Sequence, residues 1–131
     1  MTESTRELFN NFKGTLTNYT ANAFGIGMHM SAYKTTPKET KEQYKTTIRS
    51  NIKDEMELQK ELDGYAVALA EEYPFYQSIK NAMESLRDMS YKAGVAYYLC
   101  DKQEEYSRLR TTYNEDLSAF LKMMEEELEN A

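Results

Sequence analysis

The sequence predicts an all-α protein, an antiparallel four-helix bundle, and two apolar stripes at helical spacing support that prediction. Along residues 75–100, apolar and small side chains recur at alternating steps of four and three, which places them on one side of a helix. These residues are Phe75, Ile79, Ala82, Leu86, Met89, Ala93, Ala96 and Cys100. A similar spacing continues near the C-terminus at Tyr106, Leu109, Tyr113, Leu117, Phe120, Met124 and Leu128.

The first helix is expected to begin near Thr5, because Ser4 and Glu7 have the spacing of a capping box. Its apolar stripe consists of Leu8, Phe12, Leu16, Tyr19 and Ala23. Two glycines then follow within three residues, and glycine often marks the end of a helix. We therefore expect a bent or broken connection around Gly25–Lys34.

The second helix is expected to begin at Thr36-Pro37, with Glu39 completing a capping box. Its apolar stripe is thin and shifts phase near its middle, through Tyr44, Ile48, Ile52 and Met56 and then Leu58, Leu62, Tyr65 and Leu69. Pro74 ends this helix at or before Tyr73, since the residue before proline avoids helical angles.

The boundary between the third and fourth helices is placed at Asp101, which forms another capping box with Glu104. One long helix is the alternative, because no glycine or proline separates the two stripes. The apolar face changes phase at Asp101, which favours two helices joined by a very short turn. Successive helices would then be antiparallel neighbours, and the first would close the bundle or pair with a second copy in a homo-oligomer.

The composition is that of an ordinary globular protein, with 40% hydrophobic and 29% charged residues in a chain of 131, the size of one domain (1–131). A formal charge of −6 opposes nucleic-acid binding over the whole surface. Cys100 is the only cysteine, which excludes an intrachain disulfide, and it is expected to be buried. The chain shows neither a signal segment nor an apolar run of about 20 residues, so a cytoplasmic location without a membrane partner is expected.

The residues offer no evident catalytic set. His29 is the only histidine, and no spacing brings it to Cys100 or to a serine as a nucleophile–base pair would require. Met28, His29 and Met30 would point about 100° apart on a helix, which opposes their convergence on one ion. We therefore expect no enzyme activity, no metal and no cofactor, and a haem or metal-binding bundle that uses His29 is the third-ranked interpretation.

The most informative polar feature is a basic ridge on the second helix. Steps of three and four place its members on one face, and they are Lys38, Lys41, Lys45, Arg49 and Lys53. Six basic and two acidic residues occupy 34–53, whereas 54–63 contains five acidic residues and one basic residue. Closely spaced cations create a shared positive potential that attracts phosphates or an acidic protein surface. The alternative is a solvated face that pairs with acidic groups on adjacent helices.

Two functional interpretations use this basic ridge. The first is a non-catalytic macromolecular interaction protein, such as a small adaptor, inhibitor or assembly subunit, with a protein partner. The second is binding of nucleic acid or another phosphate backbone through the same five residues. Because four of the five are lysines, the ridge favours a positive field over the bidentate reading of bases.

Overall fold

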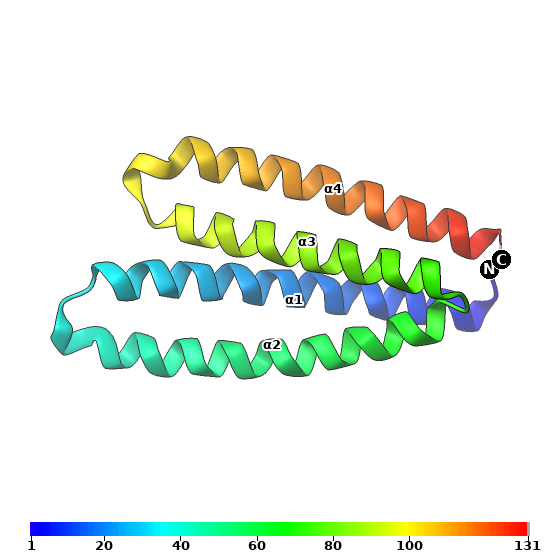
Figure 1. Ribbon diagram of the computed structural model, residues 1–131, viewed down its shortest axis with the longest axis horizontal. Coiled ribbons are helices and arrows are strands. Elements are labelled where there is room, and N and C mark those ends of the chain that lie inside the picture. Colours follow the sequence, from blue (N-terminus) through cyan, green and yellow to red (C-terminus); the bar gives the residue numbers. More distant parts are fainter. Residues whose placement is uncertain (131) are drawn as a thin grey trace.

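The computed structural model describes residues 1–130 and confirms the all-α class, with four long helices and no strand in that range (Figure 1). The helices are α1 (Glu3–Thr35), α2 (Lys41–Leu69), α3 (Tyr73–Tyr97) and α4 (Gln103–Glu129). Two single-turn 3₁₀ helices lie in the connections, η1 (Lys38–Thr40) before α2 and η2 (Cys100–Lys102) before α4. None of the helices within residues 1–130 combines the length and apolar character needed to cross a bilayer.

Successive helices run in opposite directions, as expected for an antiparallel bundle, so α1 and α3 are parallel to each other (Figure 1). These two helices form the centre of the bundle, with α2 packed against α1 and α4 packed against α3. α2 and α3 touch at few points although a short turn connects them. The first helix therefore does more than close the bundle, because it provides the main contact of both α2 and α3.

The core follows the apolar stripes of the four helices. Its most completely buried large side chains are Phe9, Phe12, Leu16, Leu62, Ile79, Leu86 and Met124. The stripes predicted for α3 and α4 are largely confirmed, since their members are buried or half-buried over 75–96 and 106–128. Burial of this apolar surface is the main stabilising contribution, as in other globular proteins.

The predicted interruption at Gly25–Lys34 is wrong, because α1 continues without a break to Thr35. A Cβ atom added at Gly27 would lie 2.1 Å from the carbonyl oxygen of Tyr91, and one added at Gly94 would lie 2.1 Å from that of Phe24. The two glycines thus allow the backbones of α1 and α3 to approach closely. A glycine within a helix costs only about 1 kcal/mol relative to alanine, so this packing can retain it.

Several helix ends differ from the predicted positions. Thr2, and not Ser4, caps α1, since its Oγ1 accepts a hydrogen bond of 3.1 Å from the backbone N–H of Thr5. The predicted start of the second helix at Thr36-Pro37 is also wrong. Thr36 is the C-cap of α1, and α2 begins at Lys41, directly after η1. α3 and α4 are separate helices joined by η2, as predicted. Cys100 lies in that connection and is exposed, so its predicted burial is wrong.

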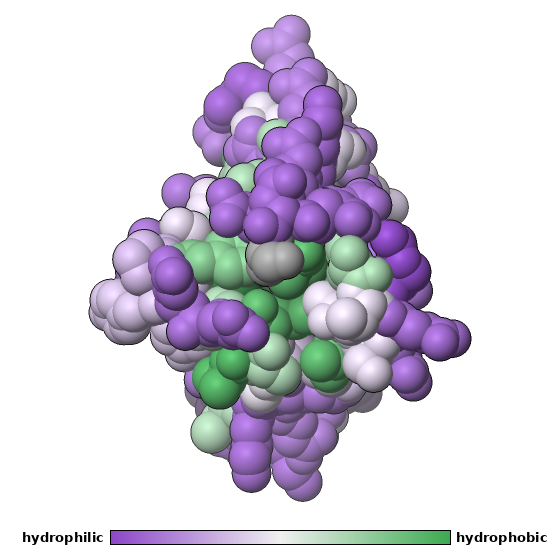
Figure 2. Space-filling view, turned by 90° about the vertical axis from the view of Figure 1, so that its right-hand side faces the viewer, coloured by the Kyte–Doolittle hydropathy of each residue, from purple (hydrophilic) through white to green (hydrophobic). Residues whose placement is uncertain are grey.

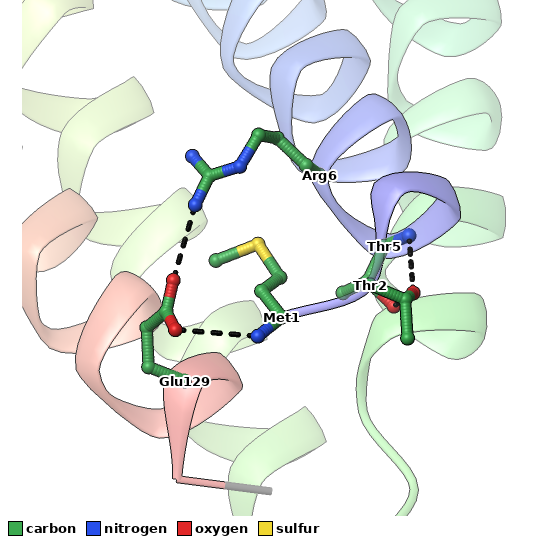
Figure 3. Close-up of polar contacts among 5 residues, drawn as sticks. All are labelled: Met1, Thr2, Thr5, Arg6 and Glu129. Atoms are coloured by element: carbon green, nitrogen blue, oxygen red, sulfur yellow. Dashed lines mark hydrogen bonds and ion pairs between the residues drawn. The ribbon is translucent and has the colours of Figure 1, made fainter.

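Polar contacts join the helices at several levels. Inside the bundle, the Ser90 hydroxyl donates to the backbone oxygen of Thr20 at 2.6 Å, and the hydroxyls of Thr20 and Tyr113 lie 2.5 Å apart. At the end that carries both chain termini, the Met1 ammonium and Arg6 contact the carboxylate of Glu129 at 3.2 and 3.1 Å (Figure 3). The first contacts link α1, α3 and α4, and the second link α1 to the end of α4.

Candidate interaction surface

The basic ridge lies at the start of α2, with its first member in η1. The antiparallel packing of α2 on α1 buries Ile48 and leaves the ridge side chains at the surface. Lys38, Arg49 and Lys53 are exposed, and the other two are half-buried. Lys38 therefore lies outside α2, whereas the other four recur every four residues along it. A partner-binding role for the five residues stays a prediction.

Few acidic groups neutralise the ridge. The ammonium of Lys45 lies 3.5 Å from Glu42 on the same helix. Lys41 lies over the ring of Tyr33, with 4.9 Å between its ammonium and the ring centroid. Within residues 1–130, no acidic group comes within 4.0 Å of the cations of Lys38, Lys41, Arg49 or Lys53. None of the five ridge residues pairs with an acidic group on another helix of the described chain.

Two apolar side chains beside the ridge are exposed, although the sequence pattern placed them on the buried stripe. Ile52 is 44% exposed and Met56 is 67% exposed. The half-buried positions at this level of α2 are occupied instead by Asn51, Glu55 and Leu58. Together with buried Ile48 and Leu62 these positions form one continuous inward face, and Ile52 and Met56 lie off it. The phase shift near Met56 reflects this departure, but it does not tell which of the two phases faces inward.

His29 lies in a polar contact between α1 and α2. The Nδ2 group of Asn51 donates to Oδ1 of Asn22 at 3.3 Å, which leaves Oδ1 of Asn51 to accept from Nδ1 of His29 at 3.1 Å. The imidazole ring also lies 6.4 Å from the ring of Tyr44. In the part of the chain that the structure describes, no three His, Cys, Asp or Glu side chains are grouped as metal ligands.

Two ion pairs hold the remaining length of α2 against α3. The carboxylate of Glu55 lies 2.5 Å from Arg87, and this hydrogen bond raises the pKa of the guanidinium. The carboxylate of Asp63 lies 2.5 Å from the ammonium of Lys80, and that hydrogen bond lowers the pKa of the carboxyl group. Two of the acidic groups in this part of α2 are therefore engaged with α3, whereas four of the five ridge cations have no ion pair in the described chain.

The opposite end of the bundle has a different character. Figure 2 views the end that carries the termini and shows apolar atoms at its centre, surrounded by hydrophilic side chains. Half-buried Met1, Ala70 and Phe75 pack against the core near this end. The hydrophilic residues of the final turns of α4 include Glu125, Glu126 and Glu129, so this end of the bundle is acidic. The basic ridge, at the start of α2, lies toward the other end (Figure 1).

Comparison with known proteins adds no relative: no protein-family model, no curated protein and no solved structure matches this chain. The functional interpretation consequently depends on the geometry and charge of the chain itself.

Proposed function

We propose that the protein is a non-catalytic interaction protein that binds an acidic surface of a protein partner through the basic ridge of α2. One observation supports this proposal above the others. Four of the five ridge cations have no ion pair within the described chain, and they lie beside two exposed apolar side chains, Ile52 and Met56. Protein interfaces combine such elements, with apolar groups that lose water and surrounding charges that orient the partner.

The exposed aliphatic groups favour a protein partner over a phosphate backbone. Sequence-independent nucleic-acid binding depends on cations and on aromatic rings that stack against bases. The large exposed apolar residues beside the ridge are isoleucine and methionine, which cannot stack in that way. Burial of either side chain against a partner would contribute up to about 1.5–3 kcal/mol, and a phosphate backbone offers little apolar surface for that burial.

A binding titration with charge-reversal variants tests the proposal. The probe is a fluorescein-labelled amphipathic peptide with leucines on one helical face and glutamates on the other. The ridge variant is Lys45→Glu with Arg49→Glu, and the matched control is Lys122→Glu with Arg108→Glu on α4, where both residues are exposed. Because close interfacial charge pairs couple strongly, we expect the ridge variant to bind at least about tenfold more weakly than the control.

The salt dependence and a second probe complete the experiment. Single-stranded and duplex DNA of equal length are titrated at low and moderate salt, since phosphate binding weakens steeply as salt rises. DNA binding that exceeds peptide binding and is lost in the ridge variant would favour the nucleic-acid interpretation. Equal peptide affinity for the ridge variant and its control would refute a role for the ridge.

The two apolar side chains provide an independent test. We expect Ile52→Ser with Met56→Ser to weaken peptide binding about tenfold or more, because each side chain loses the free energy of its burial. Since both are already exposed in the free protein, the free energy of unfolding should change by less than about 0.5 kcal/mol. Unchanged affinity in this variant would show that the partner contacts charge alone.

A further inference from the structure

A second surface feature lies close to the start of the basic ridge. A hollow of about 380 Å³ opens where the end of α1, the last turns of α3 and the start of α4 meet. Three exposed lysines from three different elements line it, Lys34 of α1, Lys92 of α3 and Lys102 of η2. The apolar part of its lining consists of half-buried Val95 and Leu99 and of buried Ala96.

The lysines of this hollow are weakly neutralised. The ammonium of Lys102 lies 4.0 Å from Glu105, a long contact between two exposed groups. Within the described residues, Lys34 and Lys92 have no ion-pair partner within 4.0 Å. A hollow that is positively charged and partly apolar fits an anionic ligand that also carries an apolar group.

The lining argues for a peptide side chain and against a nucleobase. Tyr91 is the one aromatic residue among the described residues of the lining, and the guanidinium of Arg87 already lies 5.1 Å from its ring centroid. One face of the ring is therefore already occupied by a cation, which makes Tyr91 a poor platform for base stacking. The volume is at the lower end of the range of roughly 300–1,000 Å³ that is typical of small-molecule pockets, which suits one large apolar side chain.

We propose that this hollow receives one apolar side chain from an acidic segment of the protein partner, and that carboxylates on either side of that side chain pair with Lys34, Lys92 and Lys102. The proposal depends on the proposed function and specifies it further. Lys34 lies in the last turn of α1, only four residues before Lys38, so the hollow and the ridge adjoin along the chain. One acidic segment can extend from the hollow onto the ridge.

Two matched peptides test the proposal by fluorescence anisotropy. The first is a fluorescein-labelled, end-capped Glu-Asp-Glu-Phe-Glu-Asp-Glu, and the second has glycine in place of phenylalanine. We expect the first to bind at least about tenfold more tightly, because burial of a phenylalanine side chain corresponds to a factor of that size or more. Leu99→Ser should remove most of this preference, since it makes the hollow more polar.

Variants of exposed lysines test the hollow by peptide affinity even if Leu99→Ser does not fold. Lys34→Gln with Lys92→Gln should weaken binding of both peptides about tenfold, because each lysine loses a pairing carboxylate. The matched control, Lys60→Gln with Lys122→Gln, changes two exposed lysines elsewhere and should alter neither affinity by more than about twofold. Amide shifts in NMR spectra titrated with the phenylalanine peptide should be largest around Val95 and Leu99.

The outcomes separate the two proposals. Equal affinity for the two peptides, together with weaker binding in the variant Lys45→Glu with Arg49→Glu, would refute the hollow and leave the ridge supported. Absence of binding for both peptides even at low salt would refute the hollow, and the titration with the leucine and glutamate peptide would then decide the ridge by itself. Single-stranded DNA that binds more tightly than either peptide and shows the same dependence on Lys34 and Lys92 would replace the acidic peptide with a nucleic acid.

Discussion

Replacement of Gly27 by alanine tests whether the close crossing of α1 and α3 organises this bundle. The new Cβ atom would lie 2.1 Å from the carbonyl oxygen of Tyr91 and 2.9 Å from the backbone nitrogen of Val95. Both neighbours are backbone atoms, so no side-chain rotation can relieve the contact. The two helices must separate by more than about 1 Å before that oxygen reaches an ordinary contact distance.

The expected cost follows from this separation. A gap of about 0.5–1 Å removes a quarter to a half of the dispersion energy of each atom pair that it affects, and overpacked cores typically lose about 1–3 kcal/mol. Because the contact here involves backbone of the two central helices, we expect Gly27→Ala to lower the free energy of unfolding by about 2–4 kcal/mol. Gly94→Ala should behave similarly, since its Cβ would meet the backbone of Phe24.

Gly25→Ala is the matched control, because Gly25 lies two residues away on the same helix with no atom within 4 Å of its added Cβ. Alanine has the higher helix propensity, so this variant should gain about 0.5–1 kcal/mol. The measurement is equilibrium unfolding in urea, followed by far-UV circular dichroism. If Gly27→Ala were within about 0.5 kcal/mol of the original protein with an unchanged urea dependence, the role assigned to the crossing would be wrong.

Three further predictions concern contacts between helices. Asp63 has a lowered pKa in the folded protein because its carboxylate accepts a hydrogen bond from Lys80. The ionised carboxylate therefore stabilises the fold fully above the unfolded pKa near 3.8, and this stabilisation is lost as the pH falls through the lower folded pKa. Asp63→Asn should therefore flatten the fall in urea midpoint between about pH 5 and pH 2, and an unchanged fall would contradict this account. Arg87→Met should lower the free energy of unfolding by about 1–3 kcal/mol, because it leaves the half-buried Glu55 carboxylate unpaired. If adding Glu55→Gln restores that loss in a double-mutant cycle, the unpaired carboxylate is confirmed as the cause. Tyr113→Phe removes the hydroxyl that contacts a buried threonine at 2.5 Å and should cost about 0.5–1.5 kcal/mol in thermal or urea unfolding, whereas no measurable loss would show that the contact is energetically neutral.

The basic ridge could be predicted from the sequence because its members lie on one helix. Residues three or four positions apart share a helical face whatever the rest of the fold does. The spacing of Lys41, Lys45 and Arg49 was therefore enough to place them together. The lysines of the hollow could not be grouped in this way, because Lys34, Lys92 and Lys102 come from three elements that only the packing of the helices brings together.

Ile52 and Met56 show the limit of a pattern read along one helix. Apolar character predicted burial for both, yet α2 contacts α1 along one side and touches α3 at few points, which leaves both side chains exposed. Burial depends on which neighbouring helix covers a position, and that neighbour is absent from the local pattern. The same reason explains why the exposed apolar part of the proposed interface could not be found before the fold.

The helical class, the stripes of α3 and α4 and the separation of these helices near Asp101 were determined by local sequence, because helix periodicity and phase act between residues a few positions apart. Tertiary structure decided the role of the glycines. Gly25 and Gly27 look alike in the sequence, but only Gly27 faces the backbone of α3, and there its lack of a side chain allows a close crossing within an unbroken helix. The structural role of a glycine depends on which backbone packs against it, and that neighbour is set by the packing of the whole chain.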